Sequence, residues 1–157
     1  MEPRFLVMLP FEEQRVGPYE SGAPHCTVMY WFSRRHLEVR RVCDFLDELG
    51  WYYLQGSGLT LVSKARADNF GPKGETAVYL LAENLSLIGM HHTLKQFLDL
   101  RHRCVHDVPA WSGEGYRPHV TITPRLDFEP GQIQTVRQLA LLQETAGYKE
   151  IVWAKSY

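Results

Sequence analysis

The sequence predicts an α+β fold in which helices cover the outer faces of antiparallel sheets. Two segments of similar length have the apolar spacing of helices, and short runs of β-branched and apolar residues lie before, between and after them. The chain has 157 residues and a hydrophobic content of 45%, which is enough for one domain with one core, residues 1–157. Because each half of the chain contains one helix, the two halves are expected to be related by pseudo-symmetry.

The first predicted helix follows Ser33, which can cap it, and ends at Gly50. Its inward positions keep helical spacing and are Val42, Phe45, Leu46 and Leu49. The second helix starts after Asn84, a good capping residue, and runs to about Arg103. Its expected inward residues are Ile88, Leu94, Phe97 and Leu98.

Strands and loops fill the rest of the chain. The segment 136–144 is apolar enough for a strand or a short helix, and a strand is favoured. The expected strands are 4–9, 25–32, 51–54, 59–63, 77–82, 118–123, 136–144 and 150–154. Glycine, proline and polar residues predict loops or turns at 11–24, 68–74, 104–117 and 129–131.

Two of these strands carry the same short motif. One contains Pro24-His25-Cys26-Thr27 and the other Pro118-His119-Val120-Thr121. Side chains alternate between the two faces of a strand, so each histidine shares a face with the threonine two residues later. The residues between and after them, such as Cys26 and Val120, point to the opposite, apolar face. The pattern therefore predicts two polar His/Thr pairs, one in each half of the chain.

A third His-x-Thr sequence, His91-His92-Thr93, serves as a control. It lies in the second predicted helix, where residues i and i+2 are about 200° apart around the axis and do not face each other. We therefore do not expect it to form a catalytic pair.

Two imidazoles that face each other across a groove are suited to acid–base chemistry at phosphorus. Histidine has an unperturbed pKa of about 6.5, so one ring can take a proton while the other gives one. A hydroxyl beside each ring can donate a hydrogen bond to an oxygen on which negative charge develops. Cleavage of a phosphodiester needs a base, an acid and such donors, and it does not require a metal in this arrangement.

The paired Pro-His-x-Thr motifs, with Phe70-Gly71 in a turn before the strand 77–82, resemble the 2H phosphoesterase superfamily over about residues 20–124. The resemblance implies a bilobal, pseudo-two-fold α+β fold with a central groove. It also implies a metal-independent phosphodiesterase, and the superfamily includes 2′-5′ RNA ligases, RNA 2′,3′-cyclic phosphodiesterases and phage enzymes that hydrolyse cyclic nucleotide defence signals. The catalytic residues implied for this chain are His25, Thr27, His119 and Thr121.

Five further residues near the motifs are candidates for substrate binding. Trp111 and Tyr116 lie in the loop that enters the second motif, and Tyr30 follows the first, so each could stack on a nucleobase. Arg117 and Arg125 flank the second motif strand and could hold a phosphate. The alternatives are packing of the loop onto the core for the aromatic residues and a solvated surface role for the arginines.

Composition limits the possible partners. The net charge of −1 provides no basic field for long nucleic acid, so a nucleotide or a short RNA is expected as substrate and duplex DNA is not. Three cysteines without a framework spacing favour reduced thiols and a cytoplasmic location. No signal peptide is expected, because the apolar run at residues 5–9 is too short to be a leader. No stretch approaches the roughly 18 apolar residues of a membrane-spanning helix, so no membrane contact is expected. The chain is expected to be a monomer.

No metal or other cofactor is expected. His102 and His106 have a spacing seen in zinc sites and lie near Cys104, but a fourth ligand is missing. Three other functions stay open from the sequence: hydrolysis of a cyclic nucleotide defence signal, ligation of RNA as the reverse reaction, and binding of a nucleotide or RNA end without turnover.

Overall fold

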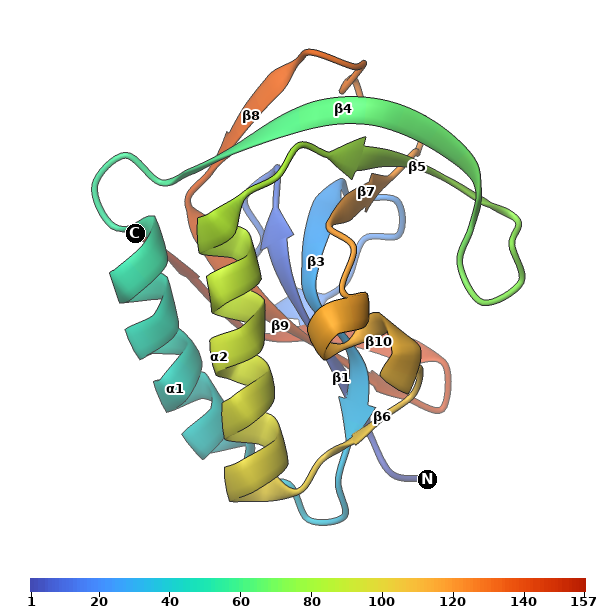
Figure 1. The fold of residues 1–157 in the computed structure, drawn as a ribbon. Coiled ribbons are helices and arrows are strands. Elements are labelled where there is room, and N and C mark those ends of the chain that lie inside the picture. Colours follow the sequence, from blue (N-terminus) through green and yellow to red (C-terminus); the bar gives the residue numbers. More distant parts are fainter.

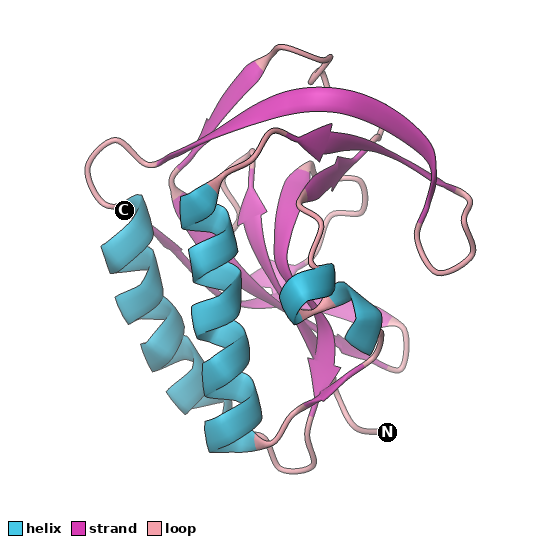
Figure 2. Ribbon diagram, in the orientation of Figure 1, coloured by secondary structure: helices cyan, strands magenta, loops and turns pink.

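The computed structural model describes residues 1–157 and confirms the α+β fold (Figures 1 and 2). Its two helices are α1 (Val39–Leu54) and α2 (Leu85–His102). Its strands are β1 (Arg4–Pro10), β2 (Gly17–Pro18), β3 (His25–Ser33), β4 (Leu59–Phe70), β5 (Thr76–Leu81), β6 (Val105–His106), β7 (His119–Thr121), β8 (Ile133–Val136), β9 (Gln138–Thr145) and β10 (Tyr148–Ser156). Two 3₁₀ turns, Pro109–Trp111 and Gly113–Gly115, precede β7.

The two motif strands lie at the centre of one antiparallel sheet. The strand order is β2-β10-β9-β1-β3-β7-β5-β4-β8, and β6 pairs with β3 beyond this path. From the centre outwards, β3 is followed by β1 and β9, and β7 is followed by β5 and β4. This arrangement is the pseudo-two-fold that the sequence predicted, and it places the two His-x-Thr motifs on neighbouring strands.

The two helices lie side by side and run in opposite directions (Figure 1). They meet through the stacked rings of Phe45 and Phe97, whose centroids are 3.9 Å apart. The larger core cluster contains residues from both helices, such as Leu46 and Leu94, together with residues of the central strands. Neither helix has the length and apolar character that crossing a membrane requires.

The prediction for the first helix is wrong at both ends. Ser33 ends β3, and the helix begins after Glu38. Residues 51–54, predicted as a strand, form its last turn, because burial of Leu54 in the core outweighs the strand preference of the aromatic residues before it. Gly50 lies within the helix, where a Cβ atom would collide with the ring of Tyr157. This glycine is needed for close packing and does not end the helix.

The second helix follows its prediction in its bounds, but Ile88, predicted to face inward, is only half-buried, and its neighbour Leu87 is buried instead. Asn84 caps it by accepting a hydrogen bond from the Leu87 amide at 3.0 Å, and Arg103 ends it in a left-handed conformation. The segment 136–144 is indeed extended, as the end of β8 and most of β9. The predicted turn at 68–74 begins later, because β4 continues to Phe70 and residues 71–75 connect it to β5.

Candidate active site

The four motif residues come together where β3 pairs with β7. Cys26 lies opposite Val120 in this antiparallel pair, and both are fully buried. The alternation of side chains therefore puts His25, Thr27, His119 and Thr121 on the other face. The same register places His25 across from Thr121 and Thr27 across from His119.

Strand geometry decides which threonine is nearer to which histidine. Two residues apart on one strand corresponds to roughly 6.5–7 Å, whereas directly opposed residues on neighbouring antiparallel strands have Cβ atoms about 4.5–5.5 Å apart. His119 is therefore closer to Thr27 than to the threonine of its own motif. In the same way, His25 is closer to Thr121. By this geometry each imidazole lies nearer to the hydroxyl of the other motif.

Both histidines are oriented by the same interaction, a hydrogen bond from Nδ1 to the backbone carbonyl two residues earlier. Nδ1 of His25 lies 3.0 Å from the carbonyl oxygen of Ala23, and Nδ1 of His119 lies 2.8 Å from that of Arg117. A carbonyl oxygen only accepts, so each Nδ1 carries a hydrogen and donates it. The remaining nitrogen of each ring, Nε2, has no hydrogen-bond partner in the protein and is free to exchange a proton.

Burial lowers the pKa of both imidazoles below the ordinary value of a histidine. In each ring the bond to the backbone carbonyl partly offsets this effect by raising the pKa. Nearby positive charge lowers it again, from Lys149 at His25 and from His25 and Arg117 at His119. At neutral pH the two rings are therefore mainly uncharged, and a proton on one of them disfavours a proton on the other.

A hollow of about 170 Å³ opens on the side of Thr27 and His119. Its walls come from β3, from the hairpin between β4 and β5, and from the segment before β7. The lining residues are Thr27, Tyr30, Asn69, Phe70, Gly71, Trp111, Gly115, Tyr116, Arg117 and His119. The hollow is thus largely aromatic, with one cation and one motif histidine at its wall.

Aromatic rings in this hollow contact each other and the histidine. The ring centroids of Phe70 and His119 are 4.2 Å apart, and those of Tyr30 and Trp111 are 4.8 Å apart in an edge-to-face arrangement. The guanidinium of Arg117 lies over Phe70 at 5.4 Å. The hollow therefore offers a planar ligand stacking surfaces directly beside one catalytic candidate.

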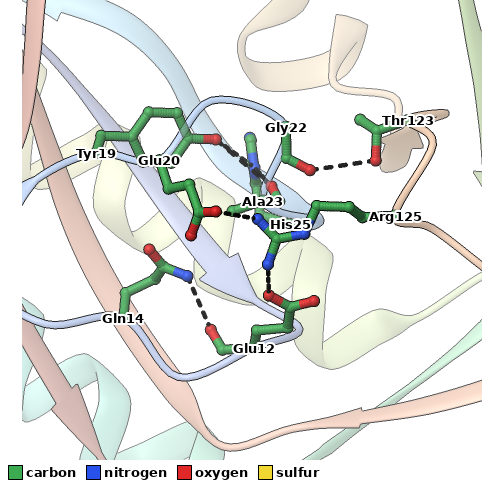
Figure 3. A network of polar contacts seen from close by, with 9 residues as sticks. All are labelled: Glu12, Gln14, Tyr19, Glu20, Gly22, Ala23, His25, Thr123 and Arg125. Atoms are coloured by element: carbon green, nitrogen blue, oxygen red, sulfur yellow. Dashed lines mark hydrogen bonds and ion pairs between the residues drawn. The ribbon is translucent and has the colours of Figure 1, made fainter.

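Four of the five predicted substrate-binding residues line this hollow, namely Tyr30, Trp111, Tyr116 and Arg117. The fifth, Arg125, lies outside it. Its guanidinium forms ion pairs with Glu12 and with Glu20, the latter at 2.9 Å (Figure 3). These ion pairs of Arg125 therefore link the segment after β7 to the loop before β3.

The loop before β3 contains Ala23, whose carbonyl oxygen accepts the hydrogen bond from His25. Polar contacts from Thr123 and Tyr19 support this loop (Figure 3). The hydroxyl of Thr123 donates to the carbonyl of Gly22 at 3.2 Å. The hydroxyl of Tyr19 lies 3.5 Å from both Nδ1 of His25 and the carbonyl of Ala23. Residues that follow the second motif thus support the loop that leads into the first.

The histidines and cysteine considered for zinc do not form a metal site. Nε2 of His106 is 2.7 Å from Oδ1 of Asp99, and His102 packs edge-on against Phe97. No group of three or more His, Cys, Asp or Glu side chains in the structure is arranged to hold a metal ion.

Comparison with known proteins gives a match in structure only. No protein-family model matches the chain, and no curated protein matches its sequence. A crystal structure of a phosphoesterase is similar with a TM-score of 0.51 and 16% identity, over 99% of this chain and 98% of the other. Escherichia coli LigT complexed with 3′-AMP is similar with a TM-score of 0.54 and 15% identity, over 99% and 97%. The chain has the 2H phosphoesterase fold.

Within the 2H phosphoesterase fold, the sequence did not single out every residue of the hollow. Asn69 and Gly71 lie beside Phe70 at the tip of the β4–β5 hairpin, and none of the three was assigned a role in binding. The Phe70-Gly71 pair did contribute to the resemblance. What the sequence could not supply is the curvature of β4, which brings the hairpin tip next to His119.

Proposed function

We propose that this protein is a metal-independent phosphodiesterase that hydrolyses nucleotide or RNA phosphodiester bonds by two-histidine acid–base catalysis. The observation that carries the proposal is the register of β3 and β7, which faces His25 with Thr121 and His119 with Thr27. The matched Nδ1 contacts support it, because they leave one proton-exchanging nitrogen on each ring.

In the proposed reaction, the neutral imidazole takes a proton through Nε2 from the attacking water. The water oxygen forms a bond to phosphorus, and the bond from phosphorus to the leaving ribose oxygen breaks. The second imidazole, protonated beforehand, gives its proton to that leaving oxygen. Each positioned proton transfer contributes about 10²–10⁴-fold to the rate. The hydroxyls of Thr27 and Thr121 donate to the non-bridging oxygens, where negative charge develops.

The position of the hollow indicates how a nucleotide binds. Thr27 and His119 line it together with Phe70 and Trp111, so the nucleoside on one side of the scissile phosphate stacks there. The similar structure of LigT with bound 3′-AMP supports a nucleotide as ligand. His119 then acts on the ribose oxygen of the stacked nucleoside, and His25 acts on the opposite side of phosphorus.

Substrates with a 2′,3′-cyclic phosphate, a 2′-5′ linkage or a cyclic oligonucleotide all fit this chemistry. A phage enzyme that removes a cyclic nucleotide defence signal would use the same four groups. Binding without turnover is the alternative from a different class, but it needs neither a second histidine nor the matched tautomers. We propose that the protein is a monomer in the cytoplasm. In that compartment the free thiols of Cys26, Cys43 and Cys104 stay reduced.

The test is a substrate panel offered to the purified protein in the presence of a chelator. The panel contains a nucleoside 2′,3′-cyclic phosphate, a 2′-5′-linked dinucleotide and a cyclic oligonucleotide. The proposal predicts turnover of at least one of them that the chelator does not reduce. Absence of turnover with all three, or loss of turnover on chelation, contradicts it.

A further inference from the structure

The third His-x-Thr sequence has a role other than the one its pattern suggests. As expected for a helix, it does not form a pair: His91 is fully buried on α2, whereas His92 and Thr93 are exposed. Nδ1 of His91 lies 2.6 Å from the carbonyl oxygen of Val28, and the amide of Gly113 donates to Nε2 at 2.9 Å. Both ring nitrogens are therefore engaged, in a single neutral tautomer.

The contact with Val28 fills a gap in the central sheet. The pairing of β1 with β3 passes from Met8–Thr27 to Val7–Met29 and so skips Val28, which is the extra residue of a bulge. A bulge takes backbone groups out of the ladder, and buried carbonyls need another donor. The side chain of His91 supplies that donor immediately after Thr27.

Tyr116 completes the same support. Its ring stacks on the ring of His91, with centroids 3.9 Å apart and planes 8° apart. Its hydroxyl donates to the carbonyl of Thr27 at 2.8 Å. Two consecutive carbonyls of the first motif strand are thus held by two stacked side chains.

The other contact of His91 reaches the second motif. Gly113 begins the turn that leads through Tyr116 and Arg117 into His119. The carbonyl of Arg117 is the group that fixes the ring of His119. His91 therefore lies between the backbone at Thr27 and the segment that orients His119.

We propose that His91 is a positioning residue for the two-histidine reaction, which holds the Thr27 hydroxyl and the His119 imidazole at a fixed separation. The proposal rests on the proposed function. His91 itself transfers no proton, because its two nitrogens are occupied by backbone groups. Its effect reaches the substrate through Thr27 and through His119.

The main test is His91→Phe, which keeps a ring that can stack on Tyr116 and removes both hydrogen bonds. Leu98→Ala is the matched control, because Leu98 is also fully buried on α2 but its apolar side chain makes no hydrogen bond to either motif. Both variants are compared at a temperature where both are folded. We expect His91→Phe to lower kcat by about tenfold or more with a smaller change in KM, since displacement of reacting groups by about 1 Å costs up to about 10²-fold. Leu98→Ala keeps kcat within about threefold.

A second readout does not depend on turnover. Titration of the His119 imidazole followed by NMR should move towards the ordinary histidine pKa in His91→Phe and stay unchanged in Leu98→Ala. If no substrate is turned over by the wild type, the proposed function fails while this titration still tests the support of His119. Equal kcat values in the two variants, with the same His119 titration, overturn the positioning role.

Tyr116→Phe supplies a test that preserves folding even if His91→Phe does not. It removes one oxygen, keeps the stacked ring and releases the Thr27 carbonyl. We expect a loss of kcat of about fivefold or more, because the same positioning of Thr27 is weakened. An unchanged kcat in this variant contradicts the proposed route through Thr27.

Discussion

Thr27 and His119 lie opposite each other on neighbouring antiparallel strands, so the hydroxyl of one motif accompanies the imidazole of the other. The site is therefore built from two mixed pairs, each with one residue from each half of the chain. Neither half alone contains a complete pair. The fold makes the site only when β3 and β7 are joined at this register.

Replacement of either motif histidine tests whether both rings take part in proton transfer. His25→Ala and His119→Ala should each lower kcat by about 10²-fold or more, because each removes one positioned proton transfer. The control is His36→Asn, since His36 is exposed and has a left-handed backbone that asparagine tolerates. Steady-state kinetics that show full activity in either alanine variant would contradict the mechanism.

Loss of a threonine hydroxyl should change the titration of the histidine in the other motif. Thr27→Val should reduce kcat by about 10²-fold, as loss of a donor to developing negative charge does. It should also shift the NMR titration of His119 more than that of His25, and Thr121→Val should do the reverse. Thr93→Val, in the exposed third His-x-Thr sequence, is the control and should change neither quantity.

The two arginines that flank β7 should behave differently. Arg117 faces the hollow and forms no ion pair, so Arg117→Ala should raise KM by about 10- to 100-fold, as expected for a lost charged hydrogen bond. Arg125 is paired with Glu12 and Glu20 at the surface, where such pairs stabilise by about 0–1 kcal/mol. Arg125→Ala should therefore change KM by less than about threefold. A larger rise in KM for Arg125→Ala than for Arg117→Ala would favour a phosphate site at Arg125.

The aromatic hollow should contribute to affinity more than to the chemical step. Base stacking on an aromatic side chain contributes about 1–3 kcal/mol, so Trp111→Ala should weaken nucleotide binding by roughly 5- to 150-fold. Trp51→Ala is the matched control, because Trp51 is exposed on α1 and away from the hollow. Equilibrium titration of the inactive His119→Ala background, with and without each substitution, measures the effect.

Two pH dependences follow from the lowered pKa values of the histidines. Catalysis needs one motif ring neutral and one protonated, and both titrate below the ordinary value of about 6.5. The profile of kcat/KM should be bell-shaped with its maximum below about pH 6.5. An optimum above pH 7.5 would require a raised pKa and contradict the burial of these rings.

Stability should fall in acid because of His91. Burial lowers its pKa to about 4, whereas the unfolded chain has an ordinary histidine pKa of about 6.5. The unfolded state therefore binds more protons, and the free energy of unfolding decreases as the pH falls from 6.5 through 4. The loss is on the order of 3 kcal/mol. Denaturant titrations at a series of pH values should show this decrease in the free energy of unfolding in the wild type and not in His91→Phe.

The sequence predicts which residues of each motif share a strand face because that signal is local. Alternation along a strand puts His25 with Thr27 and His119 with Thr121 without knowledge of the rest of the chain. The cap at Asn84 is local in the same way. These features depend on residues two or three apart, which a single sequence displays directly.

The features that the sequence did not predict depend on distant contacts. Gly50 lies within the helix, and the ring of Tyr157, more than a hundred residues later, occupies the space that a Cβ atom there would need. Arg125 pairs with Glu12 and Glu20 from the other end of the chain, and Phe70 reaches His119 only through the bend of β4. No spacing rule within one segment identifies such partners.

A crystal structure with a bound nucleoside phosphate tests the central claim most directly. The account predicts one phosphate in contact with both motifs, with a phosphate or ribose oxygen about 2.6–3.2 Å from Nε2 of His25 and another at that distance from Nε2 of His119. A phosphate that contacts only one of these rings, or that lies outside the space between them, would contradict it.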